Sequence, residues 1–590
     1  MIDFERLKTW YLDTINESVT SRQLCERDRD YYDNNQWTPK ERSVIENRGQ
    51  PVITNNKIKP KVDALIGLEI QSRVDAKAYP REPNSEDAAE AATDALRYVT
   101  DNADFNKTKT EAAYNLFIEG TCAAIVEVDK TVKGFEIFPR HIPWDRFFKD
   151  PHSSRKDGKD AKFMGQAIWM DASDAKEMFP DADPSLFAEG SNDGSIGDTY
   201  DDKPRQAMFD KGRDRVKVIE MFYHHKQWNH VFFTGNGELV PSRLSPYLDD
   251  CAEPCNPIEI QSAFIDRNNQ TYGAIRQLIS IQDEINKRGS KSLHLLSTNQ
   301  IIADKGAVEN VNKAKKEAAK PDGYIIKNPG KDFQVVRGAD LAMGQFQLLQ
   351  EAKSEIDQIG ANAAMSGKED RVMSGRALQV RQQSGAVEIA TLLDGLRDWE
   401  KRIYRQIWAR AKQFWNEQKW IRVTDDEKNL KFVGLNQPVT VGQVLEQRGT
   451  PYDVLDPRNE EIAYMQNNLA ELDVDIILDV APDTVNLQAE QFELLTQMYQ
   501  VAPQAIPLDL VMEASALPNK RQILEKMRGE TPEAQQQQQQ EQQMQQQQMQ
   551  MAEQSAQLEM AEKEAKINKT NAETEKITVQ AQVAANTPLS

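Results

Sequence analysis

Two long helical patterns occupy the middle of the chain, on either side of a compact insert. In the first, apolar residues recur from Tyr272 onward at the spacing of one helix face, at Ile275, Leu278, Ile279, Ile285, Leu293 and Leu296. The second pattern has apolar residues at Leu341, Phe346, Leu349, Ala352, Ile356 and Ile359. Each predicted helix has roughly 25 residues and spans about 40 Å. The pattern therefore predicts a long hairpin with the insert at its far end.

The insert is short and basic. Its first part is predicted to be a helix that carries Lys313, Lys315, Lys316 and Lys320. Pro321 to Gly323 form a turn signal, and Tyr324 to Lys327 have the composition of a short strand. After the second long helix comes a polar loop bounded by glycines, residues 365–375, which carries Lys368, Glu369, Asp370 and Arg371. A further long helix is predicted from Arg376 to about Trp415.

The segments on either side of the hairpin mix helices with strands. Before it, helices are predicted over residues 3–35, 57–72, 87–101, 106–119 and 173–179. Strands are predicted over 121–128 and 134–139, up to Met170, over 216–224 and near 228–233. After the long helix, strands are predicted over 420–423, 431–433 and 473–481, and helices over 487–499 and 507–513. The chain is predicted to be α+β and mainly helical.

The composition changes abruptly near the C-terminus. Glutamines fill most positions between Gln535 and Gln548, and an Ala/Glu/Lys/Gln stretch continues to about Ala585. Glutamine tracts are prone to disorder, yet Gln, Glu, Ala, Lys and Met also favour helices. Apolar residues such as Met551 and Leu558 are too sparse for a coiled coil of one copy, but they could pack around an axis shared by many copies. Both a helical and a partly disordered tail stay open.

Several short sequence segments of this chain resemble those of one family. The order of helix, insert, helix, polar loop and long helix resembles the stem, clip, stem, tunnel loop and wing helix of tailed-bacteriophage portal proteins, the head-to-tail connectors. Residues 282–291 (QDEINKRGSK) and 374–379 (SGRALQ) look like the family's stem and post-loop phrases. Residues 50–56 (QPVITNN), 142–151 (IPWDRFFKDP) and 473–484 (DVDIILDVAPDT) are similar to the branch of short-tailed Salmonella-type phages. Together they cover roughly residues 20 to 530.

The resemblance implies a division of the chain into the parts of a portal. The implied parts are a wing (1–265), stem helix 1 (266–298), a clip (299–337), stem helix 2 (338–364), a tunnel loop (365–375), a long wing helix with return strands (376–450), a crown (451–530) and a Gln-rich tail or barrel helix (531–590). On this division, Ile275, Leu278, Ile279 and Ile285 are the stem packing residues. The four loop residues Lys368 to Arg371 would face the DNA channel, and the four insert lysines would lie where other proteins dock.

The same resemblance implies a role and a set of partners. The chain would form a homo-oligomeric ring, a dodecamer in this family, at one vertex of a virion capsid assembled in the host cytoplasm. Double-stranded DNA would pass through the ring during packaging and ejection. The partners implied are the terminase large subunit, tail adaptor proteins, and the major capsid and scaffolding proteins. From composition alone, the loop residues and the insert lysines could equally be a solvated loop and a solvated helix face.

The charge balance bears on how such a ring would treat DNA. The 590-residue chain has 93 acidic and 73 basic residues, a formal net charge of −20. Proteins that grip DNA usually neutralise phosphates with a basic surface, so a simple DNA-gripping role is disfavoured. An acidic channel would repel DNA and let it slide. The alternative is that the acidity only maintains solubility.

We find no catalytic motif in the sequence. Gly367 and Lys368 do not belong to a phosphate-binding loop, because the chain lacks the earlier glycine and has Glu369 where Ser or Thr is required. Asp473 and Asp475 could be imagined in a two-metal nuclease, but they alternate on a predicted strand of an acidic protein. The chain also lacks G-x-S-x-G and H-E-x-x-H motifs. We therefore expect no enzymatic activity and no cofactor, and the energy for packaging would come from a separate ATPase.

The cysteines leave one further alternative. The four cysteines do not form a disulfide framework. Cys251 and Cys255 are separated by three residues, with His224, His225 and His230 upstream, so a zinc site can be imagined, although no second cysteine pair follows. The sequence contains no run of about 18 apolar residues, so a membrane span is not predicted. The N-terminus lacks a signal-peptide pattern. Besides a portal, the sequence leaves open a metal-dependent nucleic-acid enzyme and a non-ring virion adaptor or scaffold.

Overall fold

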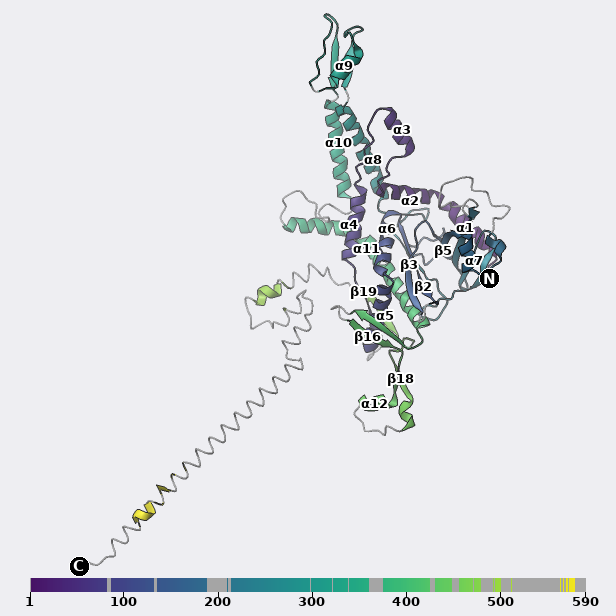
Figure 1. Ribbon diagram of the computed structural model, residues 1–590, viewed down its shortest axis with the longest axis vertical. Coiled ribbons are helices and arrows are strands. Elements are labelled where there is room, and N and C mark those ends of the chain that lie inside the picture. The colour runs from purple at the N-terminus through teal and green to yellow at the C-terminus, as the bar shows by residue number, and fades with distance from the viewer. Residues whose placement is uncertain are drawn as a thin grey trace, which may run out of the picture. The chain divides into compact units, whose positions relative to one another are not determined.

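The computed structural model describes most of the chain up to residue 478. The described residues are 2–81, 86–131, 135–187, 209–210, 214–297, 299–320, 322–337, 339–359, 375–424, 430–447, 456–470 and 472–478, with scattered positions between 492 and 578. One compact unit comprises residues 1–425 and 429–480, and a second comprises 426–428 and 481–590. All helices and strands named below belong to the first unit (Figure 1).

The first N-terminal helix packs on an antiparallel sheet. Helix α1 spans Phe4–Glu17 and α2 spans Val19–Tyr32, so the single helix predicted over residues 3–35 is wrong. It is interrupted at Ser18, which ends α1 and precedes α2. The sheet has the order β4-β5-β7-β8-β9, with β6 beside β7. The strands are β4 Phe147–Lys149, β5 Phe163–Asp171, β6 Phe209–Asp210, β7 Arg215–His225, β8 Gln227–Phe233 and β9 Glu238–Leu244.

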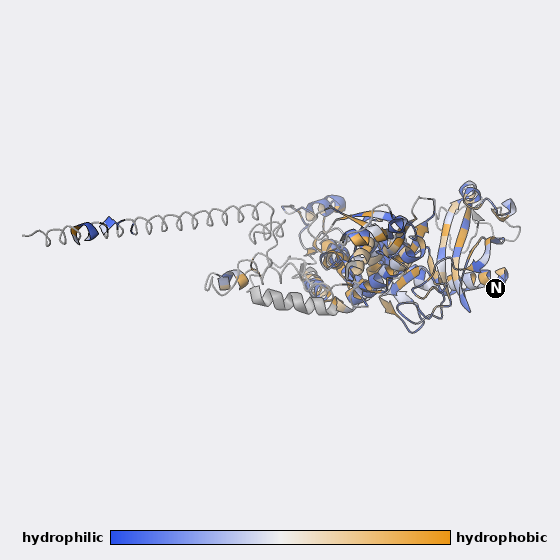
Figure 2. Ribbon diagram, turned by 90° about the horizontal axis from the view of Figure 1, so that it is seen from below, coloured by the Kyte–Doolittle hydropathy of each residue, from blue (hydrophilic) through white to orange (hydrophobic). Residues whose placement is uncertain are grey.

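Aromatic side chains form the core between α1 and the sheet. Tyr11 of α1 lies edge-on against Phe148 and Phe233, with ring centroids 5.0 and 6.4 Å apart. Such edge-to-face pairs add to the stabilisation from buried apolar area. In Figure 2 the strands near the N-terminus show apolar and polar residues in alternation, as expected where one face of a strand packs on a core. Helix α7 (Ala172–Met178) and a 3₁₀ turn (Pro184–Phe187) follow β5.

A second layer joins several helices to a three-stranded sheet. The sheet order is β10-β2-β3, with β2 Thr121–Asp129, β3 Glu136–His141 and β10 Ile258–Ser262. The helices are α4 Ile58–Gln71, α5 Glu86–Asn102 and α6 Phe105–Ile118, whereas α3, Pro39–Asn47, precedes them and has no buried residue. These bounds confirm the helices predicted over 57–72, 87–101 and 106–119 and the strand pair that follows them. The largest hydrophobic core of the chain lies here.

The long helix α11, Gly375–Phe414, is fixed to this layer by directed hydrogen bonds. The indole Nε1 of Trp399 donates to the carbonyl of Glu259 at 2.9 Å. The guanidinium of Arg402 donates to the Glu259 carboxylate at 3.0 Å and to the Ile260 carbonyl at 2.6 Å. Glu400 forms a buried ion pair with Lys109 of α6. Breaking such a buried pair by removing one partner is costly, so α11 is held at a defined position on the sheet.

The C-terminal part of the first unit returns to the N-terminal part. After α11 come β15 Lys419–Thr424, β16 Leu430–Leu435, β17 Gln437–Thr440, α12 Val441–Gln447, a 3₁₀ turn Pro457–Glu460, β18 Ile462–Gln466 and β19 Val474–Leu478. Strand β19 pairs antiparallel with β1, Ala76–Pro80, and Ala76 lies opposite Leu478. The strands predicted over 420–423 and 431–433 are confirmed. Of the strand predicted over 473–481, residues 474–478 form β19, and 479–481 lie outside the described residues.

The predicted hairpin is present but shorter than expected. After the short strands β11 (Phe264–Ile265) and β12 (Thr271–Tyr272) and a 3₁₀ turn (Arg276–Leu278), helix α8 spans Ile279–Ser297. It packs against α10, Ala339–Gln358. The helices have 19 and 20 residues, which corresponds to about 30 Å each. Beyond their far ends lie β13 (Asn299–Ala303), α9 (Val311–Ala318) and β14 (Phe333–Arg337) (Figure 1).

The strand predicted at Tyr324 to Lys327 is wrong. Strand β13 pairs with β14 instead, with Asn299 opposite Arg337, and the segment between α9 and β14 has no ladder partner. The side chains of Tyr324 and Ile326 are exposed. Local composition favoured a strand, but β13 and β14, on either side of α9, satisfy each other's backbone groups. The helices predicted over 487–499 and 507–513 lie mostly outside the described residues; positions 492, 494–499 and 511 are helical.

Candidate functional site

The base of the α8–α10 hairpin lies in the protein's own core. The four residues predicted to pack the stem, Ile275, Leu278, Ile279 and Ile285, are all buried in the largest hydrophobic cluster. Ala352 and Ile356 of α10 belong to the same cluster. The first half of the predicted apolar stripe is therefore buried as expected. Its packing partners belong to the same protomer.

The polar residues of α8 bind a distant extended segment. The backbone N–H groups of residues 53, 55 and 57 donate to Ser290 Oγ at 3.1 Å, Asn286 Oδ1 at 2.9 Å and Gln282 Oε1 at 2.9 Å. These acceptors are four residues apart, so they lie along one face of the helix. Two of the phrases that carried the family resemblance, 50–56 and 282–291, thus meet in one hydrogen-bonded junction, which fixes the base of the hairpin.

The far half of the hairpin exposes apolar side chains. Leu296 of α8 is 68% exposed and Phe346 of α10 is 55% exposed, although both belong to the apolar patterns predicted for their helices. Other large apolar side chains share this exposure: Leu293, Met343 and Leu348. Periodicity alone could not find this change, because the residues continue the spacing of the buried ones. A group of exposed apolar side chains on one element is typical of an interaction surface.

The tip beyond the hairpin presents the predicted lysines to solvent. Lys313, Lys315, Lys316 and Lys320 are exposed on α9 and just after it, whereas Ala314 between them is buried. Asn310 caps the helix, because its side chain accepts from the Lys313 N–H at 3.0 Å. Lys320 Nζ lies 2.7 Å from Glu317 Oε1, so the described ion pairs engage only one of the four lysines. Sequence reasoning missed Tyr324 and Ile326, which are exposed on the same tip.

The predicted tunnel-loop residues, Lys368, Glu369, Asp370 and Arg371, lie outside the described residues. So do the glutamine tract between Gln535 and Gln548 and most of the tail. Within the tail, the described positions 574–578 are helical.

The two carboxylates that could suggest a nuclease site are engaged by an arginine. Arg81, directly after β1, donates to Asp473 Oδ1 at 2.8 Å and to Asp475 Oδ1 at 2.6 Å. The side chains are exposed, and the hydrogen bond from Arg81 lowers the pKa of Asp475. A single cation therefore bridges both acids and connects β1 to β19. This arrangement explains the acid pair as part of the β1–β19 contact.

The cysteine pair does not assemble with the upstream histidines. Cys255 is buried, and Arg410 Nη2 lies 3.4 Å from its sulfur, whereas Cys251 is exposed. His230 is buried in the other sheet, where its Nε2 lies 2.9 Å from Glu220 Oε1. Among the described residues, no group of three or more His, Cys, Asp and Glu side chains is placed to hold a metal ion.

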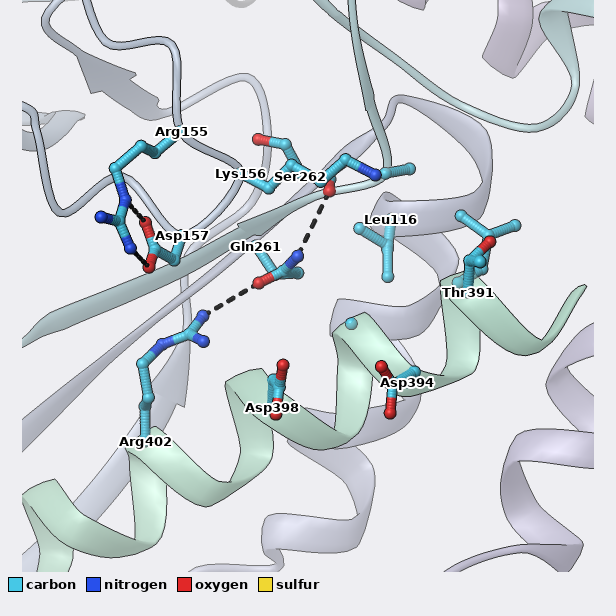
Figure 3. Close-up of a pocket in the computed structure, with 13 residues that line it drawn as sticks. Leu116, Arg155, Lys156, Asp157, Gln261, Ser262, Thr391, Asp394, Asp398 and Arg402 are labelled. Atoms are coloured by element: carbon cyan, nitrogen blue, oxygen red, sulfur yellow. Dashed lines mark hydrogen bonds and ion pairs between the residues drawn. The ribbon is translucent and has the colours of Figure 1, made fainter.

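A polar cavity of about 380 Å³ lies between α11 and β10 (Figure 3). Asp394, Asp398 and Arg402 project from α11 toward it in Figure 3, and Gln261 projects from β10. Both arginines that line the cavity are already paired. Arg402 binds Glu259 and Gln261, and Arg155 binds Asp157 at 2.7 Å. We interpret the cavity as a charged junction between α11 and the sheet.

No helix in the described part of the chain is long and apolar enough to cross a membrane.

Similarity to known proteins identifies the protein class. The family described as "Phage P22-like portal protein" matches residues 8–237 and 224–570. The chain is also similar to the portal protein of Helicobacter pylori bacteriophage KHP30, with 21% identity over 99% of this chain and 94% of that protein. The family match spans most of the chain, and the chain therefore belongs to the phage P22-like portal protein family.

Proposed function

We propose that twelve copies of this chain form a ring at one capsid vertex, through which viral DNA enters during packaging and leaves during ejection. Portal proteins are structural components of the virion, and the family membership supports a head-to-tail assembly role. The proposed parts are the wing (1–265), stem (266–298 and 338–364), clip (299–337), tunnel loop (365–375), long wing helix (376–450), crown (451–530) and tail (531–590).

The observation that carries the ring proposal is the uncovered far half of the α8–α10 hairpin. Leu296 and Phe346 are exposed in the protomer, and burial of one such side chain contributes about 1.5–3 kcal/mol. In a closed ring every copy contacts its two neighbours through the same pair of surfaces. Adjacent hairpins would cover these side chains with one another and form the stem of the ring.

The tip of the hairpin fits a docking surface for other proteins. It combines at least three lysines outside the described ion pairs with the exposed side chains of Tyr324 and Ile326. A cluster of cations around an aromatic side chain suits a partner with an acidic rim and an apolar pocket. We propose the terminase large subunit as the partner during packaging and tail adaptor proteins afterwards, with the capsid and scaffolding proteins contacting other parts of the ring.

Particle mass and shape test the ring directly. The chain mass is 67.1 kDa, so twelve copies would form a particle of about 0.8 MDa. Negative-stain images should show rings with an open axial channel, and incubation with DNA and Mg²⁺ should produce no cleavage. Monomers or filaments in the images would favour a non-ring adaptor or scaffold. Metal-dependent cleavage would favour the nuclease alternative.

Deletion of residues 368–372 is expected to leave ring formation intact. The loop is polar and bounded by glycines, so its removal costs little buried area. Packaging or retention of DNA should decrease, because the deletion removes Lys368, Glu369, Asp370 and Arg371 from the proposed channel. The measurement is genome content per particle in a complementation assay, with the four residues replaced by Gly and Ser at unchanged loop length as control. Full-length genomes at normal yield in the deletion variant would argue against a role at the DNA.

Truncation after Gly529 is expected to leave the first unit folded and ring-forming. The Gln-rich tail has few apolar side chains to bury, so one isolated copy should be at best marginally helical. Circular dichroism of the tail peptide should show mostly coil, and fusion of the tail to a ring-forming scaffold should raise its helicity. The truncated virion should differ in genome length or ejection. Loss of rings on truncation would place the tail in the assembly interface instead.

A further inference from the structure

Two buried polar groups without described hydrogen bonds line one small cavity. Lys149 Nζ and Thr121 Oγ1 are each inaccessible to solvent, and neither makes a described hydrogen bond. Ser262 Oγ, on the neighbouring strand, also lacks one, although Ser262 does not line this cavity. Unsatisfied buried groups of this kind are rare in folded proteins, and each one calls for a partner such as water or an ion. Two of them at one cavity therefore point to a bound water or ion.

Strand register brings the two hydroxyls together. Thr121 of β2 lies directly opposite Ser262 of β10 in the antiparallel pair, so both side chains are on the same face of the sheet, about 5 Å apart. Ala123 and Ile125 of β2 occupy the same face and belong to a cluster with Phe147 of β4. Lys149 is two residues after Phe147, so its side chain points to the same face of β4.

A cavity opens at this place. It has a volume of about 100 Å³ and is lined by Lys149 and Thr121, by Arg22 of α2, and by Ser18, Ser21 and the segment 269–271. This volume exceeds the ~30 Å³ that one water molecule occupies in the liquid. The cavity therefore has room for a small polyatomic ion or for several waters.

The charges around the cavity favour an anion. Its lining includes two cationic residues, Lys149 and Arg22, and one carboxylate, Glu119. Arg29 offsets that carboxylate, because its Nε and Nη2 atoms lie 2.6 and 3.0 Å from the Glu119 oxygens. The Arg22 guanidinium is held in place by the carbonyls of Asp145 and Phe147 at 3.0 and 2.7 Å. A fixed cation and a second, unpartnered cation thus line the same space.

The two acids whose charges act on Lys149, Asp160 and Asp150, are committed elsewhere. Asp150 accepts from the N–H groups of His152 and Lys162 at 3.0 and 3.1 Å. Asp160 accepts from Ser153 Oγ and the Ser154 N–H, both at 2.7 Å. Burial lowers the pKa of Lys149. The negative charges of Asp160 and Asp150 oppose this shift, but neither carboxylate forms a described hydrogen bond with the ammonium. The ammonium therefore has no described partner of its own.

We propose that this cavity binds a small inorganic oxyanion, of the phosphate or sulfate class. The oxyanion would accept hydrogen bonds from the Lys149 ammonium and the Thr121 hydroxyl, and its charge would be offset by Lys149 and Arg22. Charge-assisted hydrogen bonds of this type are the strong ones. Bound there, the ion would connect α2, β4 and β2, and so tie the N-terminal helices to both sheets. The proposal does not depend on ring formation.

Equilibrium dialysis of the full-length protein against inorganic phosphate, at constant ionic strength in a chloride buffer, tests the site. We expect saturable binding of about one phosphate per chain, with sulfate as a competitor. Lys149→Met should weaken binding at least about tenfold, because it removes a charge-assisted hydrogen bond. Lys162→Met, at an exposed lysine after Asp160, is the matched control and should bind as the wild type does.

Thr121→Val keeps the proposal testable if Lys149→Met fails to fold. It removes the hydroxyl but not the charge, so it should weaken phosphate binding less than Lys149→Met does. Absence of saturable binding to the wild-type protein would mean that the cavity holds only water, and would overturn the proposal. Equal phosphate affinity in the wild type, Lys149→Met and Thr121→Val would overturn it as well.

Discussion

Ile279→Asp is expected to destabilise the protomer itself, and not only to impair assembly of the ring. Ile279 is 7% exposed and belongs to the largest hydrophobic cluster of the chain. An aspartate there would place a carboxylate inside this apolar cluster. The expected loss is about 3–5 kcal/mol of unfolding free energy, which is a large share of the 5–15 kcal/mol typical of a folded domain.

Chemical denaturation monitored by circular dichroism measures this effect on the protomer. Ile279→Val is the matched control, because it removes one methylene group and should cost only about 0.5–1.5 kcal/mol. A well-folded Ile279→Asp protomer that fails only to assemble would contradict the buried position and would return this residue to an interface between copies.

The sequence predicted elements well where the pattern was local and continuous. The long helix expected from Arg376 to about Trp415 is α11, and α4, α5 and α6 begin and end within a few residues of their predicted bounds. In these segments the helical spacing agrees with the tertiary packing. Helix α3 was not predicted, although it begins with a capping box. The break at Ser18 was not predictable from periodicity, because apolar residues continue across it.

Long-range pairing set the limits of the prediction. Strands β1 and β19 are almost 400 residues apart in the sequence, and no nearby hairpin signal predicts that they pair. The bridge from Arg81 to Asp473 and Asp475 depends on that pairing. Read alone, the two acids resembled scattered carboxylates. The strand predicted at Tyr324 failed for the same reason, since the ladder is closed by β13 and β14 instead.

The candidate interaction surface could be predicted only in part from the sequence. The stripe from Ile275 to Leu296 has one spacing throughout, yet its first half is buried and its second half is exposed. The difference arises from the rest of the fold, because the large core reaches only the base of the hairpin. Amphipathicity predicts that a helix face must be covered. It does not say whether the cover comes from the same chain or from another copy.

Leu296→Asp and Phe346→Asp together are expected to abolish ring assembly while the protomer stays folded. Both side chains are mostly exposed in the protomer, so the change removes little intrachain packing. In the proposed stem each aspartate would face a neighbouring hairpin, where burial of a charge without a partner costs several kcal/mol. The same cost recurs at every interface of the ring. The pair thus contrasts with Ile279→Asp on the same helices.

Sedimentation velocity and circular dichroism separate assembly from folding in this variant. We expect a species near the 67.1 kDa chain mass in place of the large particle, with an unchanged far-ultraviolet spectrum and unfolding midpoint. Met178→Asp on α7 is the control, because Met178 is equally exposed but lies far from the hairpin in the fold. Normal rings in the Leu296→Asp, Phe346→Asp variant would show that copies meet elsewhere. The exposed half of the hairpin would then have to contact a different protein.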